Sequence, residues 1–227
     1  MRIQRHLLLA SIVSILSFSD QASASIIQVN SRAALGTVQT IDWNAFGPPG
    51  ALVSTPFTVA AASELVTVSS SQGTLSRHRE GTDFVGNFAV GDQLLTDTGS
   101  SSDTFGIRWT SPVRSVGTQI QRDFPRTGTF TAYMDFFSAT NVLLGEVSVT
   151  GNGTSAEDNT AIFIGGVSTS FDIARVALWI DNAPDAFPAR SGNLAINRMD
   201  IGVLVPAPGA AALVLPLLAL LGVRRRS

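Results

Sequence analysis

Histidine, serine and carboxylate side chains are the residues that could carry hydrolytic chemistry in this chain. Between residues 25 and 205 the sequence contains one histidine, His78, with Ser76 and Asp83 nearby. A Ser-His-Asp set would have to use it, but no Gly-x-Ser-x-Gly nucleophile elbow occurs in the chain. His78 lies between Arg77 and Arg79 in a polar stretch, which is typical of an exposed strand or loop residue. We therefore expect no catalytic residue.

Paired carboxylates are the second chemistry to consider, because glycoside hydrolysis needs two acids on either side of the scissile bond. The candidates are Glu64, Glu80, Asp135 and Glu146. Asp135 and Glu146 fall on the polar faces of two neighbouring predicted strands, where solvated carboxylates are common. A secreted hydrolase is therefore the least favoured of the functions considered below.

Two acidic turns could bind calcium, which prefers clustered carboxylate and carbonyl oxygens. They are residues 157–159 (Glu-Asp-Asn) and residues 181–185 (Asp-Asn-Ala-Pro-Asp). Neither matches the twelve-residue calcium loop with its Asp-x-Asp-x-Asp-Gly pattern. Solvated turns are the preferred interpretation, so we expect neither a metal nor another cofactor.

Aromatic side chains could form a platform for sugar rings. Trp109 alternates in phase with Phe105 and Ile107, which predicts a core position. Trp179 is out of phase with the apolar residues around it, so it is the aromatic residue predicted to make a possible glycan contact. The alternative is that the following loop, residues 182–192, covers it. Trp43 and Tyr133 are further candidates.

Charge and composition exclude several classes of protein. The 181 residues from 25 to 205 contain 16 acidic residues against 10 arginines, a formal charge of −6, and this stretch offers no basic footprint for nucleic acid. The chain has no cysteine, so disulfides, thiolate zinc sites and cysteine nucleophiles are excluded. This length suits one domain with one core.

Period-two alternation predicts β-strands through most of the chain. It is clearest where Phe130, Ala132, Met134 and Phe136 alternate with polar residues. In the next strand it predicts Leu143 on the same face as Val147, with Leu144 on the opposite face. A change of parity at residues 197–198 predicts a β-bulge. Many short strands with Gly-rich turns predict an all-β fold, an antiparallel β-sandwich of jelly-roll-like form over residues 25–204. An open barrel is the alternative.

The N-terminus has the pattern of a secretory signal peptide, predicted over residues 1–24. Arg2 and Arg5 precede an apolar run of 12 residues from 7 to 18, and Ala22-Ser23-Ala24 forms a small-x-small cleavage site. A bilayer-spanning helix needs roughly 20 apolar residues. We therefore expect signal peptidase to cleave after Ala24.

The C-terminal residues 205–227 combine three elements in order. Val205, Pro206 and Pro208 end the last strand, residues 210–223 are apolar, and Arg224, Arg225 and Arg226 follow. Prolines cannot continue a strand ladder. The apolar run predicts a transmembrane helix, and the arginines would stop transfer and stay in the cytoplasm.

This tail resembles the PEP-CTERM family of Gram-negative sorting tails, with Ala207 in place of the usual glutamate. The resemblance implies recognition and cleavage by an exosortase in bacteria that make exopolysaccharide. The strands around residues 161–165, 173–176 and 196–202 are more loosely similar to domains that precede such tails. An ordinary single-span anchor that is never cleaved is the alternative.

Together these features predict a non-enzymatic, exported envelope or extracellular-matrix protein. It would lie in the inner membrane during processing and then at the cell surface or outside the cell. Exosortase and signal peptidase are the expected processing partners, and exopolysaccharide is a possible further partner. The alternative function is a carbohydrate-binding module.

Overall fold

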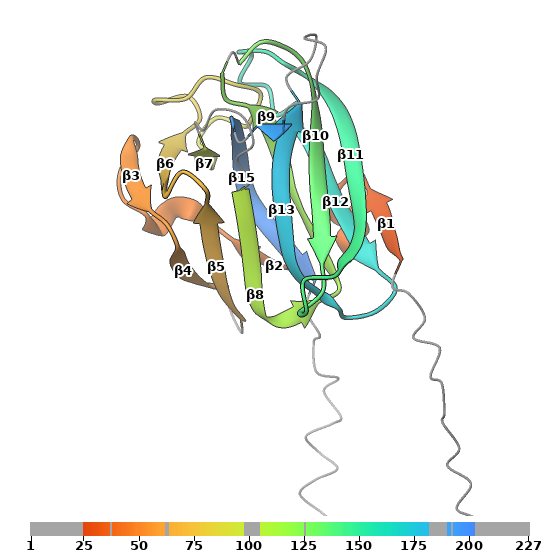
Figure 1. Ribbon diagram of the computed structural model, residues 1–227. Helices are drawn as coiled ribbons and strands as arrows, with labels where there is room; N and C mark the ends of the chain where they lie inside the picture. The colour runs from red at the N-terminus through yellow and green to blue at the C-terminus, as the bar shows by residue number, and fades with distance from the viewer. Residues whose placement is uncertain are drawn as a thin grey trace, which may run out of the picture.

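The structure, a computed structural model, describes residues 25–36, 38–61, 64–97, 105–124, 126–181, 190–191 and 193–202 (Figure 1). The predicted signal peptide and sorting tail lie outside these ranges, and so do Ala22, Ala24, Val205, Pro206, Pro208 and Arg224 to Arg226. Within the described ranges, no helix is both long enough and apolar enough to cross a bilayer.

Two antiparallel sheets form the molecule, which confirms the predicted β-sandwich (Figure 1). The first sheet has the strand order β1-β12-β9-β15-β7-β6-β3, with β2 paired to β15. Its strands are β1 (Ile26–Val29), β2 (Gln39–Ile41), β3 (Ala51–Ser54), β6 (Thr74–Arg79), β7 (Gln93–Asp97), β9 (Ser115–Arg122), β12 (Ile162–Ser168) and β15 (Leu194–Gly202).

The second sheet has the order β11-β10-β13-β8-β5-β4, with β14 paired to β13. Its strands are β4 (Phe57–Ala61), β5 (Glu64–Ser70), β8 (Phe105–Val113), β10 (Gly128–Phe137), β11 (Leu143–Gly153), β13 (Ile173–Asp181) and β14 (Arg190–Ser191). Two short 3₁₀ helices, η1 (Arg32–Leu35) and η2 (Trp43–Ala45), connect strands of the first sheet.

The core lies between the two sheets and follows the predicted alternation. The alternating residues Phe130, Ala132, Met134 and Phe136 of β10 are buried, and so are Phe105, Ile107 and Trp109 of β8. The predicted bulge in β15 is confirmed, because its pairing with β9 shifts register between Ile196 and Met199.

One strand departs from the predicted parity. Leu143 of β11, expected on the same face as Val147, is exposed, whereas Leu144 packs against the core. The cause is a register shift in the pairing with β10, where Phe136 faces Gly145 and Phe137 faces Leu143. Leu144 is the extra residue of this irregularity.

Two connecting segments partly cover the outer face of the first sheet. The loop of residues 80–92, between β6 and β7, packs Phe84 and Phe88 on Leu94, Ala161 and Ala195, which form a second apolar cluster. The segment that contains η1 lies over the same sheet, because Ser115 on β9 donates to the carbonyl of Leu35 at 2.9 Å. The 80–92 loop and the η1 segment leave part of this outer face uncovered between them.

Candidate functional site

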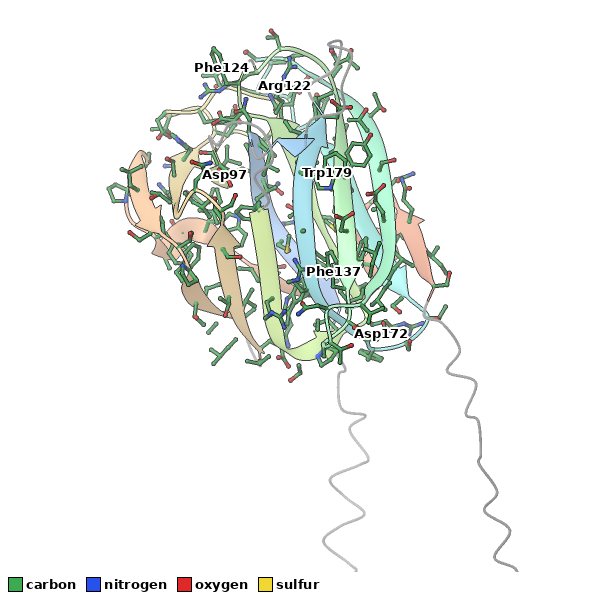
Figure 2. The ribbon with its side chains drawn as sticks, viewed as in Figure 1. Asp97, Arg122, Phe124, Phe137, Asp172 and Trp179 are labelled. Atoms are coloured by element: carbon green, nitrogen blue, oxygen red, sulfur yellow. The ribbon has the colours of Figure 1, made fainter. Side chains whose placement is uncertain are left out.

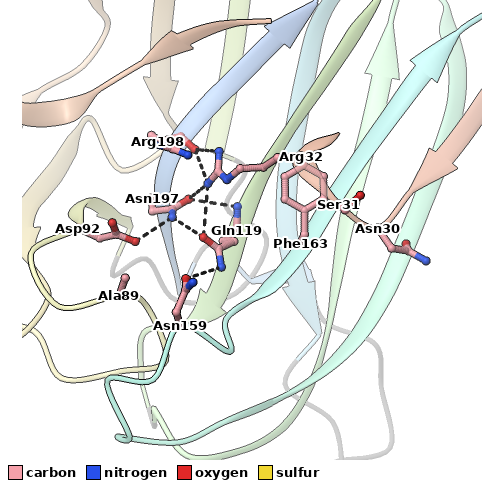
Figure 3. A pocket seen from close by; sticks show the side chains of 10 residues that line it. All are labelled: Asn30, Ser31, Arg32, Ala89, Asp92, Gln119, Asn159, Phe163, Asn197 and Arg198. Carbon is pink, nitrogen blue, oxygen red and sulfur yellow. Dashed lines mark hydrogen bonds between the residues drawn. The ribbon is translucent and has the colours of Figure 1, made fainter. Parts of the chain in front are cut away.

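A pocket of about 430 Å³ lies between the 80–92 loop and the segment before η1, on the outer face of β9, β12 and β15 (Figure 3). Its volume falls within the range of about 300–1,000 Å³ that small-molecule sites occupy. Amide, charged and aromatic side chains line it: Asn30, Ser31, Arg32, Ala89, Asp92, Gln119, Asn159, Phe163, Asn197 and Arg198.

The floor of the pocket is a hydrogen-bonded network centred on Asn197, in the bulge of β15. Asn197 is 3% exposed, and its amide nitrogen donates to Gln119 Oε1 at 2.6 Å and to Asp92 Oδ2 at 3.0 Å. Its amide oxygen accepts from Arg32 Nη2 at 2.7 Å. Gln119 in turn donates to Asn159 Oδ1 at 3.1 Å. Five separate segments are therefore held in one geometry by side chains that satisfy each other.

Arg32 closes one side of the network with an ion pair. Its guanidinium donates to Asp200 of β15, whose side chain is 2% exposed and also accepts from Thr40 Oγ1 at 2.6 Å. Burial lowers the pKa of Arg32, and the Asp200 carboxylate opposes that shift. The Asp200 carboxylate thus balances the charge of the Arg32 guanidinium that lines the pocket.

Phe163 of β12 supplies the aromatic surface. Its ring leans across the sheet onto Gly117 of β9 and Gly165 of β12, which face each other in the strand register. A Cβ atom at Gly117 would lie 2.5 Å from Phe163 Cζ, and one at Gly165 would lie 3.1 Å from Cε1. The ring therefore occupies space that only glycine leaves open. The Arg32 guanidinium lies 5.7 Å from the ring centroid.

Several polar groups of the pocket remain available to a ligand. In the described part of the chain, Arg198 is exposed and has no ion pair, and Asp92 uses one carboxylate oxygen on Asn197. Asn159 uses its amide oxygen on Gln119, which leaves its NH₂ group free to donate. The charges of Arg198 and Asp92 balance each other, so the pocket presents donors and acceptors without a net charge.

The residues considered for a Ser-His-Asp set lie elsewhere. His78 is half-buried on β6, where its Nδ1 lies 2.8 Å from Asp83 Oδ2. The other oxygen of Asp83 accepts from the Arg79 amide at 2.8 Å. Both bonds brace the turn after β6, and Ser76 is not among the hydrogen-bond partners of either side chain.

The four acids considered for glycoside hydrolysis do not come together in one site, although two of them are cross-strand neighbours. Glu64 accepts from Thr110 and Ser111 at the far end of the second sheet. Asp135 and Glu146 face each other across β10 and β11, as the strand assignment predicted. Glu146 is exposed, but Asp135 is only 3% exposed, so the expectation of a solvated carboxylate is wrong for Asp135. Glu80, the first residue of the 80–92 loop, is buried and accepts a hydrogen bond from the Gly86 amide at 2.5 Å.

Trp179 lies on the outer face of the second sheet, the side that its phase predicted (Figure 2). It is only 6% exposed, and its indole stacks on the cross-strand neighbour Tyr133 with ring centroids 3.8 Å apart and planes 3° apart. One face of the indole is thus occupied by Tyr133. A glycan contact at Trp179 stays a prediction.

The remaining predicted candidates have structural neighbours. Trp43 is fully buried and donates from Nε1 to the carbonyl of Asn197 at 2.7 Å, which supports the floor of the pocket from below. Asp158 accepts from Thr160, and its neighbour Asn159 lines the pocket. Of residues 181–185, only Asp181 is described. No group of three or more metal-ligating side chains occurs in the described ranges.

Reasoning from sequence missed the residues that form the pocket. Two signals pointed toward them. Glycines inside a strand mark close approach of another group, and Gly165 follows Phe163 in an otherwise apolar strand. A bulge re-aims side chains out of the regular pattern, and the predicted bulge contains Asn197 and Arg198.

The structure is a β-sandwich with a polar pocket on the outside of one sheet. No family model matches the chain, and no curated protein matches its sequence. Its likenesses are found among solved structures, at identities of 9–13%.

A DUF4465 family protein from Bacteroides caccae is similar over 78% of this chain and 99% of its own, at 9% identity and a TM-score of 0.41. The family 11 carbohydrate-binding module from Clostridium thermocellum, solved with a mixed-linked tetrasaccharide, matches 74% of this chain and 96% of its own. That match has 10% identity and a TM-score of 0.19. The tailspike protein 4 domain of bacteriophage CBA120 matches 81% of this chain and 20% of its own, with a TM-score of 0.26.

Proposed function

We propose that this chain is a non-enzymatic, exported protein of the bacterial surface or matrix that associates with exopolysaccharide. The observation that carries the proposal is the chemical character of the pocket. It combines amide, carboxylate and guanidinium groups with one aromatic ring and presents no net charge. Sugar hydroxyls both donate and accept hydrogen bonds, so a surface with both kinds of group and an apolar wall suits them.

The two ends of the sequence support export. The segment 1–24 has the order of a secretory signal, and residues 205–227 resemble a PEP-CTERM tail with a transmembrane helix. We infer that signal peptidase removes the first and an exosortase the second. We also interpret the sandwich as jelly-roll-like, because the chain changes sheets repeatedly after β7.

The experiment that tests this proposal is fractionation of a culture of the producing bacterium. We expect the protein to elute with the high-molecular-mass exopolysaccharide in high salt, which removes purely ionic adsorption. Mass spectrometry of that fraction should find peptides that begin at Ser25 and none that contain Arg224 to Arg226.

Two results would contradict the proposal in different ways. Protein that elutes free of polymer in high salt would remove the association with exopolysaccharide. An intact C-terminal peptide in a membrane fraction would show that the tail is not cleaved and instead anchors the protein permanently.

A further inference from the structure

We propose that the pocket is a subsite for one neutral pyranose residue of a polysaccharide, whose apolar ring face stacks on Phe163. The inference rests on the proposed function and deepens it by naming the ligand class and the residues that bind it. Three features of the described residues carry it: the placement of the ring, the rigidity of the polar network, and the balance of charge.

The ring of Phe163 is placed by an arrangement that weakens the sheet. Glycine in a strand interior lowers stability, because it loses more backbone entropy and packs no side chain. Gly117 and Gly165 are nevertheless direct cross-strand partners in the middle of the first sheet. Their bare backbones receive the Phe163 ring, which leans over them and is half-buried in the pocket wall. The two glycines therefore support one side of the ring. The ring also lines the pocket, where the Arg32 guanidinium lies 5.7 Å from its centroid.

A pyranose ring offers such a partner, since its axial C–H groups form an apolar face while its hydroxyls point outward around the edge. The exposed Arg198 is drawn on the same side of Phe163 as two further polar groups of the pocket rim, Asp92 from the 80–92 loop and Asn159 (Figure 3). The Asn197 and Gln119 amides hold these groups through mutual hydrogen bonds. A preorganised rim of this kind loses little entropy when a ligand binds.

The charges favour a neutral sugar over an acidic one. Arg32 is paired with Asp200, so its guanidinium has no uncompensated charge to offer a carboxylate. The Asp92 carboxylate faces the same pocket as Arg198 and balances its charge, so the pocket offers an acidic sugar no net electrostatic attraction. Residues 25–205 as a whole carry a formal charge of −6, which further disfavours an anionic polymer.

The test is affinity electrophoresis of the full-length protein in detergent. The native gels are cast with hydroxyethylcellulose, galactomannan, alginate or the polymer extracted from the producing bacterium. Phe163→Leu keeps an apolar side chain and removes the aromatic face, whereas Phe163→Tyr keeps the face. Phe124→Leu is the matched control, because Phe124 is 75% exposed and lies outside the pocket (Figure 2). Asn159→Gly removes an amide at a positive-φ position (φ 61°) that glycine tolerates.

We expect retardation in the bacterial polymer and in at least one of the two neutral polymers, with none in alginate. Phe163→Leu should weaken retention roughly tenfold, the effect of losing one stacked aromatic contact. Asn159→Gly should also weaken it, Phe163→Tyr should retain more binding than Phe163→Leu, and Phe124→Leu should match the wild type.

The outcomes separate this inference from the proposed function. If the wild type is retarded and both Phe163→Leu and Asn159→Gly behave like it, the protein binds polysaccharide elsewhere and the subsite is wrong. Retardation in alginate alone would also overturn the choice of a neutral sugar. If the bacterial polymer retards nothing, the proposed function fails together with the inference.

Discussion

Replacing Arg32 by methionine is expected to lower the free energy of unfolding by about 2–4 kcal/mol, because it leaves the buried Asp200 carboxylate without its cation. Thr40 still donates to Asp200 at 2.6 Å, which keeps the loss below that of a fully isolated charge. Urea denaturation followed by tryptophan fluorescence measures the change. Arg198→Met is the control, since Arg198 is exposed and has no ion pair within the described ranges.

A second substitution separates the ion pair from simple packing. Adding Asp200→Asn to Arg32→Met removes the uncompensated charge, so the double variant should recover a large part of the lost stability. If Arg32→Met unfolds no more easily than Arg198→Met, the ion pair does not support this face of the sheet. If the double variant is no more stable than Arg32→Met, the loss came from packing.

The second large effect concerns Glu80 and pH. Glu80 is 1% exposed, and burial raises its pKa from 4.5 to about 7. The hydrogen bond from the Gly86 amide lowers this pKa, whereas the nearby charge of Glu157 raises it further. Arg126 acts in the opposite direction. The folded protein thus holds a proton that the unfolded chain releases near pH 4.5. The contribution of Glu80 to stability is therefore full below pH 4.5 and is lost as pH rises from 4.5 to about 7.

Glu80→Gln imitates the protonated side chain, so it should raise stability above neutral pH by up to about 3 kcal/mol and leave it unchanged at low pH. The backbone of Glu80 holds the other end of the 80–92 loop, since its N–H donates to the Asp92 carbonyl at 3.0 Å. Hydrogen exchange at the Gly86 and Gly91 amides should therefore slow in the variant above neutral pH. Glu146→Gln, on an exposed strand position, is the control. Equal pH slopes for Glu80→Gln and the wild type would show that Glu80 is ionised at neutral pH in the folded protein.

The sandwich could be predicted because its central strands bury one face and expose the other. Phe105, Ile107 and Trp109 show this period plainly, and all three are in the core. Leu143 was misplaced because one extra residue in β11 changes the parity, and a bulge leaves little trace in a short apolar run.

The pocket could not be assembled from the sequence, because topology brings its residues together. Arg32 and Asn197 are 165 positions apart and meet only because β15 lies beneath η1. Trp179 is a residue whose position could be predicted from the sequence but whose neighbour could not. Its phase correctly predicted the outer face, but the stacked cross-strand neighbour Tyr133 was visible only once the strand register was known.

The most direct measurement is an NMR titration of the ¹⁵N-labelled protein, in detergent, with oligosaccharides released from the exopolysaccharide of the producing bacterium. Side-chain amide signals report on the pocket through Asn159 and Asn197, and the indole signal reports on Trp179 separately. Binding at the pocket predicts saturable shifts of the two amides while the Trp179 indole stays in place. A shift of the indole with unmoved pocket amides would place the saccharide on the second sheet and contradict the account given above.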